Sequence, residues 1–218
     1  MGLLRSQGRE PTIDQVQALR SSLGMGVSSL DPEGLMATAP RSANQQVMVD
    51  WLLQATYPAE GVVDRVVECF QIADRHLWPK ARYTPPFPHT TALLERLAQG
   101  AVPVGVLSSD SHANVEEFLT HYDLAYWVQA WRGTEAGEPA KPDPSLFHQL
   151  CSDLGVHPHH TLVVGDSGVD FDLAQQAGAA GFISVSDAWG RPPVRGAEWV
   201  VFSWQDLQVQ IDSGGQNT

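Results

Sequence analysis

The chain has 218 residues, with 13 lysines and arginines against 25 aspartates and glutamates, so its formal net charge at pH 7 is −12. This acidic balance argues against partners such as nucleic acids or anionic membrane surfaces, because both need clustered positive charge. The two cysteines form no CxxC pair, and no apolar run is long enough to span a bilayer or to act as a signal peptide. The composition therefore predicts a cytoplasmic protein with a substantial core, and it says nothing about the oligomeric state.

The first part of the chain has the pattern of a helical unit. Apolar residues recur at helical spacing in residues 12–23, 45–54 and 60–77. Between the first two segments, residues 30–35 are typical of a short helix with Asp31 as its N-cap and Pro32 in its first turn. No convincing strand precedes residue 100. We therefore expect residues 12–82 to form a helical domain.

From residue 83, after a proline-rich connector, short apolar segments alternate with helical ones. The predicted strands are 102–107, 126–131, 161–164, 181–185 and 199–202, and the predicted helices are 90–99, 114–121, 144–154 and a helix that ends at Ala177. Strands that alternate with helices predict an α/β fold with a Rossmann-like, doubly wound parallel sheet. We expect residues 83–212 to form this core and residues 213–218 to be a flexible tail.

Polar side chains gather where the predicted strands end, which is the edge at which open parallel sheets bind ligands. They are Ser108 and Ser109 after the first strand, Lys141 before a helix, and Asp166 and Asp170 after the third strand. Hydroxyl groups at a helix N-terminus and a lysine can bind a phosphate, and carboxylates are the ligands that Mg²⁺ prefers. Each feature alone has an ordinary explanation as a helix cap, a solvated lysine or a turn, but together they predict a phosphoryl-transfer site.

Three segments resemble the second, third and fourth motifs of the haloacid dehalogenase superfamily, in its phosphoglycolate-phosphatase-like branch. They are Val104–Leu119 (VGVLSSDSHANVEEFL), Lys141–Pro144 (KPDP) and Thr161–Gly178 (TLVVGDSGVDFDLAQQAG). The resemblance extends over about residues 90–205. The first part of the chain resembles the cap domain of that branch in being helical, but it carries no matching motif.

The resemblance implies a Mg²⁺-dependent phosphatase that acts on a small phosphorylated metabolite through an aspartyl-phosphate. By this resemblance Ser108 and Ser109 bind the phosphoryl group. Lys141 holds that group and the nucleophile, so Ser108 and Lys141 are the catalytic residues that remain. The resemblance also implies that Asp166 ligates Mg²⁺ and that Asp170 supports the metal shell.

The sequence departs from the family at the first motif, an apolar strand that ends in Asp-x-Asp-Gly-Thr and carries the nucleophile and the general acid/base. The nearest string, at Asp31, has Glu in place of the second Asp and a weakly apolar approach, and Asp14 lies in a predicted helix. We expect the strand that carries this motif to be missing from the middle of the sheet. The side chains expected to line the resulting gap are Val104, Val106 and Val163.

Two explanations of this departure are open. The chain is either an N-terminally shortened phosphatase that is inactive as it stands, or a non-catalytic relative that binds a metal or phosphate compound; the retained site residues favour the first. A dehalogenase or a phosphomutase on the same fold is a further alternative, and the Asp166/Asp170 pair argues against the dehalogenase. The histidine-rich segment 157–160 is expected to be a solvated turn rather than a metal site.

Overall fold

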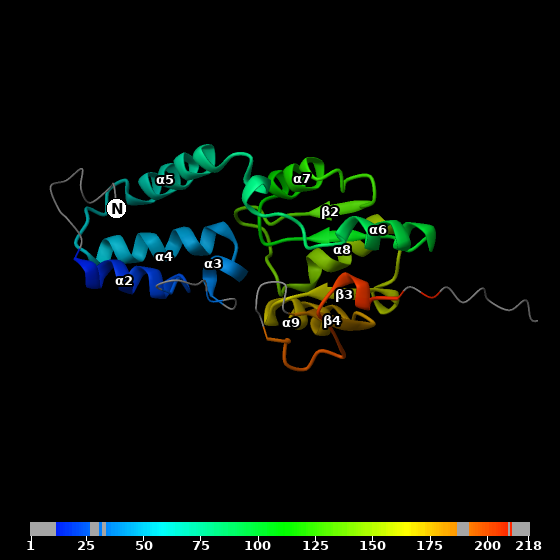
Figure 1. The fold of residues 1–218 in the computed structure, drawn as a ribbon. Coiled ribbons are helices and arrows are strands. Elements are labelled where there is room, and N and C mark those ends of the chain that lie inside the picture. Colours follow the sequence, from blue (N-terminus) through cyan, green and yellow to red (C-terminus); the bar gives the residue numbers. More distant parts are fainter. Residues whose placement is uncertain (1–11, 27–30, 32–33, 187–191, 209, 211–218) are drawn as a thin grey trace, which may run out of the picture.

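The computed structural model describes residues 12–26, 31, 34–186, 192–208 and 210 (Figure 1). A helical region, defined here as elements α2 to α5, is followed by a connector that contains η1 (Lys80–Tyr83) and by an α/β region, defined as elements α6 to η3. The two regions lie side by side in Figure 1. Within the described residues, no helix is both long and apolar enough to cross a membrane.

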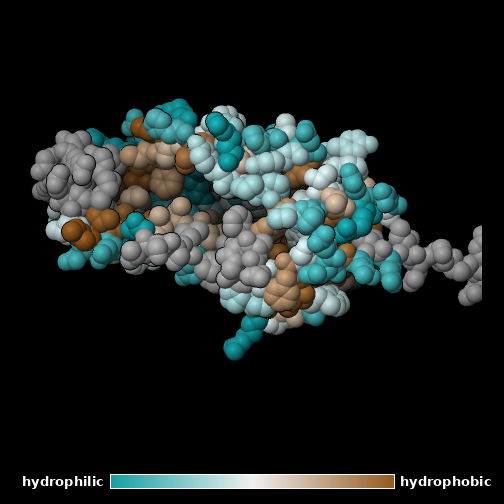
Figure 2. Space-filling model, in the orientation of Figure 1, coloured by the Kyte–Doolittle hydropathy of each residue, from teal (hydrophilic) through white to brown (hydrophobic). Residues whose placement is uncertain are grey.

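The helical region is held together mainly by the contact between two of its helices. Its elements are α2 (Ile13–Ser22), α3 (Leu35–Thr38), α4 (Arg41–Gln54) and α5 (Val62–Leu77). The buried cluster consists of Val49, Leu52, Tyr57, Val62 and Val66, and Figure 2 shows apolar atoms gathered between α4 and α5. Helix α2 buries none of its side chains, and Trp51 Nε1 of α4 attaches it by donating to Gln15 O at 3.0 Å.

The short helix predicted at residues 30–35 begins later than expected. Helix α3 starts at Leu35 and its N-cap is Gly34, so the prediction of Asp31 as N-cap is wrong. The cause is a tertiary contact, since a β-carbon on Gly34 would lie 2.6 Å from Gly24 Cα. The Gly34 N–H donates to Asp31 O, which places Asp31 in the turn before the helix. The neighbouring Leu30, Pro32 and Glu33 lie outside the described residues.

The α/β region follows the predicted alternation of strands and helices. Its helices are α6 (Thr90–Gln99), α7 (His112–His121), α8 (Pro144–Leu154), η2 (Pro158–His160), α9 (Gly168–Ala177) and η3 (Trp204–Asp206). Its strands are β1 (Gly105–Leu107), β2 (Ala130–Arg132), β3 (Leu162–Gly165), β4 (Gly181–Val185) and β5 (Trp199–Val201), and each pairing is parallel. The strand predicted at 126–131 is shorter because its first part is a turn, closed by the Trp127 N–H donating to Leu124 O. The predicted tail at 213–218 lies outside the described residues.

The described strands form two sheets. β1 pairs with β2, and β3 pairs with β4, which pairs with β5. The break between β1 and β3 is the predicted position of the missing strand. The three valines do not line one common gap, because Val104 and Val106 pack against the cluster of α6 and α7, whereas Val163 packs against the cluster of α8 and α9. One face of β3 stays open, with Leu162 47% and Val164 44% exposed.

Helix α8 joins the two sheets. It packs against β1, β2 and α9, and α9 packs in turn on β3 and β4. Leu107 at the end of β1 and Val163 in β3 contact the same buried cluster, which consists of Phe147, Cys151, Leu173 and Ala177. β1 and β3 therefore pack against one common cluster although the strands belong to separate sheets.

Candidate functional site

The loop from Ser108 to Ser111 (the Ser108 loop) connects β1 to α7. The Ser108 N–H donates to Arg132 O at 3.0 Å, and Ser108 Oγ accepts the Asp110 N–H at 3.1 Å. Ser111 caps α7 because its hydroxyl oxygen accepts the Asn114 N–H. Since Ser108 Oγ accepts a backbone N–H, its own proton can be donated to an anion outside the loop. The loop thus presents a hydroxyl donor at a helix N-terminus, where negative charge is stabilised.

Lys80 neutralises a carboxylate in this loop. Its Nζ lies 2.6 Å from Asp110 Oδ2, and Asn114 Nδ2 donates to Asp110 Oδ1 at 2.6 Å. Burial raises the pKa of Asp110, but the hydrogen bonds from Lys80 and Asn114, together with the charge of Lys80, outweigh burial and hold the pKa below its usual value. Sequence reasoning assigned no role to Lys80, because it lies in the connector between the two regions and belongs to no motif.

Ser109 connects the Ser108 loop to the helical region. Its hydroxyl group donates to Thr38 O of α3 at 3.0 Å. In this arrangement the Ser109 hydroxyl proton is donated to Thr38 O and is not available to a ligand. The predicted phosphate-binding role of Ser109 requires this hydrogen bond to break, whereas the role predicted for Ser108 requires no such change.

Lys141 and Asp170 form a buried ion pair at the end of β3. Lys141 Nζ lies 2.6 Å from Asp170 Oδ1, and the two side chains are 12% and 11% exposed. Ser167 caps α9 and also donates from its hydroxyl group to Asp170 Oδ2 at 2.7 Å. A β-carbon on Gly165 would lie 2.5 Å from Asp170 Cβ, so a glycine is needed for the carboxylate to approach the strand end.

The ion pair determines the charge state of Asp170. Burial raises the pKa of this carboxyl, but the charge of Lys141 and the hydrogen bonds from Lys141 and Ser167 outweigh burial and place the pKa below its usual value. Each carboxylate oxygen already accepts a hydrogen bond. This geometry favours Asp170 as the residue that orients Lys141 over Asp170 as a direct metal ligand.

The predicted metal ligand Asp166 lies at the end of β3. Asp166 follows β3 directly and is half-buried, but no three His, Cys, Asp or Glu side chains of the described chain are grouped to hold a metal ion. Mg²⁺ requires several oxygen ligands in near-octahedral geometry. Because Mg²⁺ is usually bound by one or two carboxylates with waters that complete its shell, Asp166 is a suitable donor. The segment at 157–160 is a turn, as predicted, and it contains η2.

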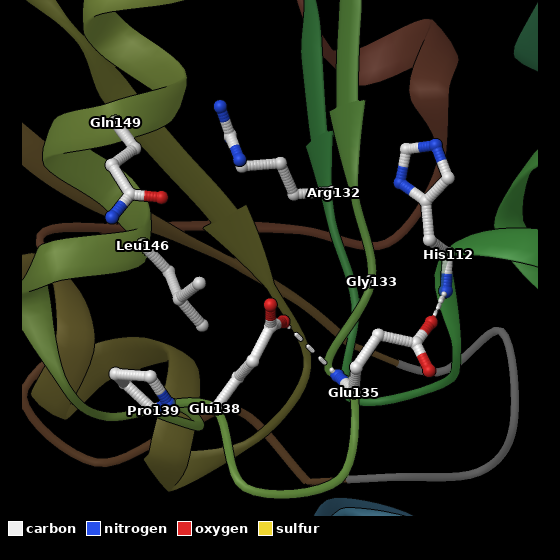
Figure 3. A pocket seen from close by; sticks show the side chains of 8 residues that line it. All are labelled: His112, Arg132, Gly133, Glu135, Glu138, Pro139, Leu146 and Gln149. Carbon is white, nitrogen blue, oxygen red and sulfur yellow. Dashed lines mark hydrogen bonds between the residues drawn. The ribbon is translucent and has the colours of Figure 1, made fainter.

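A pocket of about 250 Å³ lies beside the Ser108 loop, at the end of β2 (Figure 3). It is lined by His112, Arg132, Gly133, Glu135, Glu138, Pro139, Leu146 and Gln149. Glu135 accepts the His112 N–H at 2.9 Å, and Arg132 forms an ion pair with Asp153 at 2.6 Å. Both charged side chains therefore already have partners within the protein. None of the predicted site residues lines this pocket.

The chain was compared with families and with individual proteins. A model of the haloacid dehalogenase-like hydrolase family matches residues 16–178. Phosphoglycolate phosphatase of Yersinia pseudotuberculosis is 33% identical over 92 residues, which cover 42% of this chain and 40% of that protein. The phosphoglycolate phosphatase of Synechococcus elongatus is 32% identical over 104 residues, covering 48% of this chain and 46% of that protein. The matches thus span less than half the length of these two relatives.

Solved structures show the same fold. A predicted phosphoglycolate phosphatase from Haemophilus somnus superimposes with a TM-score of 0.66 at 19% identity, covering 88% of this chain and 86% of that chain. Because the alignment includes both regions, the similarity extends to the helical region as well as to the α/β region. This likeness confirms the predicted α/β fold.

Proposed function

Because the chain belongs to the haloacid dehalogenase-like hydrolases, we propose that its site is built to hydrolyse a small phosphate monoester. The observation that carries the proposal is the largely buried Lys141–Asp170 pair at the end of β3; Ser108, which presents a hydroxyl donor at the end of β1, is proposed to face the same ligand. A fixed cation and a fixed hydroxyl donor are the groups that stabilise charge on a phosphoryl group during transfer. The names of the relatives make phosphoglycolate the first substrate to test.

The residues of this chain have separate roles in the proposal. Ser108 donates its hydroxyl proton to a phosphoryl oxygen, and the N-terminus of α7 contributes partial positive charge. Lys141 neutralises a second oxygen, and Asp170 is the positioning residue that orients its ammonium group. Asp166 is the proposed Mg²⁺ ligand, and a bound Mg²⁺ would neutralise negative charge on the phosphoryl group.

The helical region is proposed to act as a cap over this site. The contacts that support this role are the hydrogen bond from Ser109 to Thr38 O and the ion pair between Lys80 and Asp110. A cap excludes bulk water and limits the size of the substrate, so the proposed substrate is a small metabolite.

The nucleophile is the part that the sequence does not supply, because no Asp-x-Asp-Gly-Thr string occurs in it. We propose that this chain alone turns over no phosphate ester, and that a form extended upstream with an apolar strand ending in Asp-x-Asp is active. The break between β1 and β3 supports this position for the added strand. The genomic sequence before Met1 tests the idea directly, since an immediate in-frame stop codon contradicts it.

A phosphatase assay separates the possible outcomes. With Mg²⁺ and either p-nitrophenyl phosphate or phosphoglycolate, the chain as given is expected to be inactive and the extended form active. Activity of the given chain that is lost in Asp31→Asn would show that Asp31 is the nucleophile after all.

The missing motif also favours a second candidate, a non-catalytic protein that binds a phosphate compound. Calorimetry with inorganic phosphate distinguishes the two functions when it is combined with the assay. Phosphate binding that is lost in Lys141→Met but kept in the matched Lys80→Met, with an inactive extended form, would support the non-catalytic role. Absence of phosphate binding in both forms would contradict both candidates.

A further inference from the structure

The chain just after β2 runs along the Ser108 loop. The first contact is the Ser108 N–H donating to Arg132 O. Two more follow, because the Thr134 N–H donates to Asp110 O at 2.8 Å and Thr134 Oγ1 donates to Ser108 O at 3.1 Å. Thr134 is 6% exposed. The amide of Ser108 is therefore fixed by the last residue of β2, and its carbonyl is fixed by Thr134 just after that strand.

Close backbone packing allows these contacts. A β-carbon on Gly133 would lie 2.2 Å from His112 N and 2.3 Å from Ser111 C, so the segment after β2 touches the first turn of α7. Figure 3 shows Gly133 between Arg132 and Glu135, and the Glu135 carboxylate meeting the His112 N–H. Without a side chain at position 133, Thr134 reaches the carbonyl groups of the loop.

We infer that Thr134 is the positioning residue of the Ser108 loop, and the inference rests on the proposed function of Ser108 as a phosphoryl-group ligand. Fixing the carbonyl groups of Ser108 and Asp110 sets the backbone on both sides of Ser109. That backbone holds the Asp110 N–H against Ser108 Oγ, which leaves the Ser108 proton for the anion. Thr134 lies outside the three motif-like segments, and its residue type alone carries no signal for this role.

A purely structural role for Thr134 is the competing explanation. A buried hydroxyl group needs a hydrogen-bond partner, and its removal lowers stability whatever the function of the loop. The two roles differ in where the effect is observed. A positioning role changes the Ser108 loop and its affinity for phosphate, whereas a structural role changes only the free energy of unfolding.

The test compares Thr134→Val, which removes the hydroxyl group, with Thr134→Ser, which keeps it. Thr161→Val is the matched control, since Thr161 Oγ1 also donates to a backbone carbonyl, His157 O at 3.1 Å, before the start of β3. Each variant is measured by urea unfolding, by hydrogen exchange of residues 106–111 and by calorimetry with inorganic phosphate.

We expect Thr134→Val to speed exchange in residues 106–111 and to weaken phosphate binding about five- to tenfold, as for the loss of one hydrogen bond. Thr134→Ser is expected to restore both, and Thr161→Val to leave both unchanged. Wild-type phosphate binding that persists unchanged in Thr134→Val overturns the inference alone. A wild-type chain that binds no phosphate overturns the proposed function, and the inference fails with it.

Discussion

The helical region and the α/β region differ in how many of their side chains are buried. Among its described residues, the helical region has one buried cluster, and α2 buries no side chain. In the α/β region, every residue of β4 is buried, and α8 and α9 bury four residues each. The polar groups proposed to handle a phosphoryl group all lie in the α/β region, where α8 and α9 each bury more residues than any helix of the helical region.

The two regions meet at the Ser108 loop. The hydrogen bond from Ser109 to Thr38 O and the ion pair between Lys80 and Asp110 both end on this loop. We therefore expect the α/β region to fix the proposed site, and the contacts made by Thr38 and Lys80 to be weaker and to change when a substrate enters. The following four predictions test this contrast.

The largest effect is expected from Lys141→Met in the α/β region. This change leaves the Asp170 carboxylate buried without its cation, and we expect it to lower the free energy of unfolding by about 3 kcal/mol. Urea unfolding measures the loss. The double variant Lys141→Met/Asp170→Leu is expected to recover part of it, because no charge is then left unpaired. Equal losses in the single and double variants would show that the ion pair is not the cause.

A smaller effect is expected from Val66→Ala in the helical region. Val66 is fully buried between α4 and α5, and removal of its two methyl groups is expected to cost about 2 kcal/mol. If the two regions unfold separately, hydrogen exchange speeds up in α4 and α5, while exchange in α9 and β4 stays at the wild-type level. Equal acceleration in both regions would show that they unfold as a single unit.

Acid is expected to weaken the α/β region through Asp170 and Asp110. The pKa of each carboxyl is lower in the folded chain than in the unfolded chain, so each stabilises the fold above the unfolded value, which is about pH 4. That stabilisation is lost as the pH falls from this value through the folded pKa. Urea unfolding between pH 3 and 7 should show the decline, with a smaller slope in Asp170→Asn than in the exposed control Asp14→Asn. Equal slopes in these two variants would show that Asp170 is not a source of the pH dependence.

The smallest effect is expected from Lys80→Met at the junction of the two regions. Lys80 and Asp110 are partly exposed, with side-chain exposures of 30% and 39%, so solvent screens their attraction and the expected loss is about 0.5 kcal/mol. Arg132→Met removes the similarly exposed pair with Asp153 and is the matched control. If the Lys80–Asp110 pair holds the connector against the α/β region, Lys80→Met is cleaved faster by protease between α5 and η1. Arg132→Met is expected to be cleaved at the wild-type rate.

The sequence was sufficient where the physical cause is local. The apolar segment at 181–185 became β4 within its predicted bounds, and the helix at 144–154 became α8, because Asp143 caps it and Gly155 ends it in a left-handed conformation. Lys141, before a predicted helix, and Asp170, after the third predicted strand, were expected at one edge of the sheet, and their ion pair shows that the two side chains meet.

The prediction was wrong where a distant segment decides the outcome. Helix α3 begins after Gly34 because the backbone of Gly34 packs on that of Gly24, which no local pattern around Asp31 indicates. The contribution of Lys80 was missed for the same reason, since its partner Asp110 lies 30 residues away.

The sequence by itself determined the fold class, the helical first part and the residue types that collect at the strand ends, because hydrophobic periodicity and capping act over a few residues. Only the tertiary structure decided that the strands form two sheets joined by α8. It also decided that Asp170 faces Lys141 and that Thr134 holds the Ser108 loop. These are contacts between chain segments 26 to 29 residues apart, and their geometry depends on the packing of whole elements rather than on the sequence around each residue.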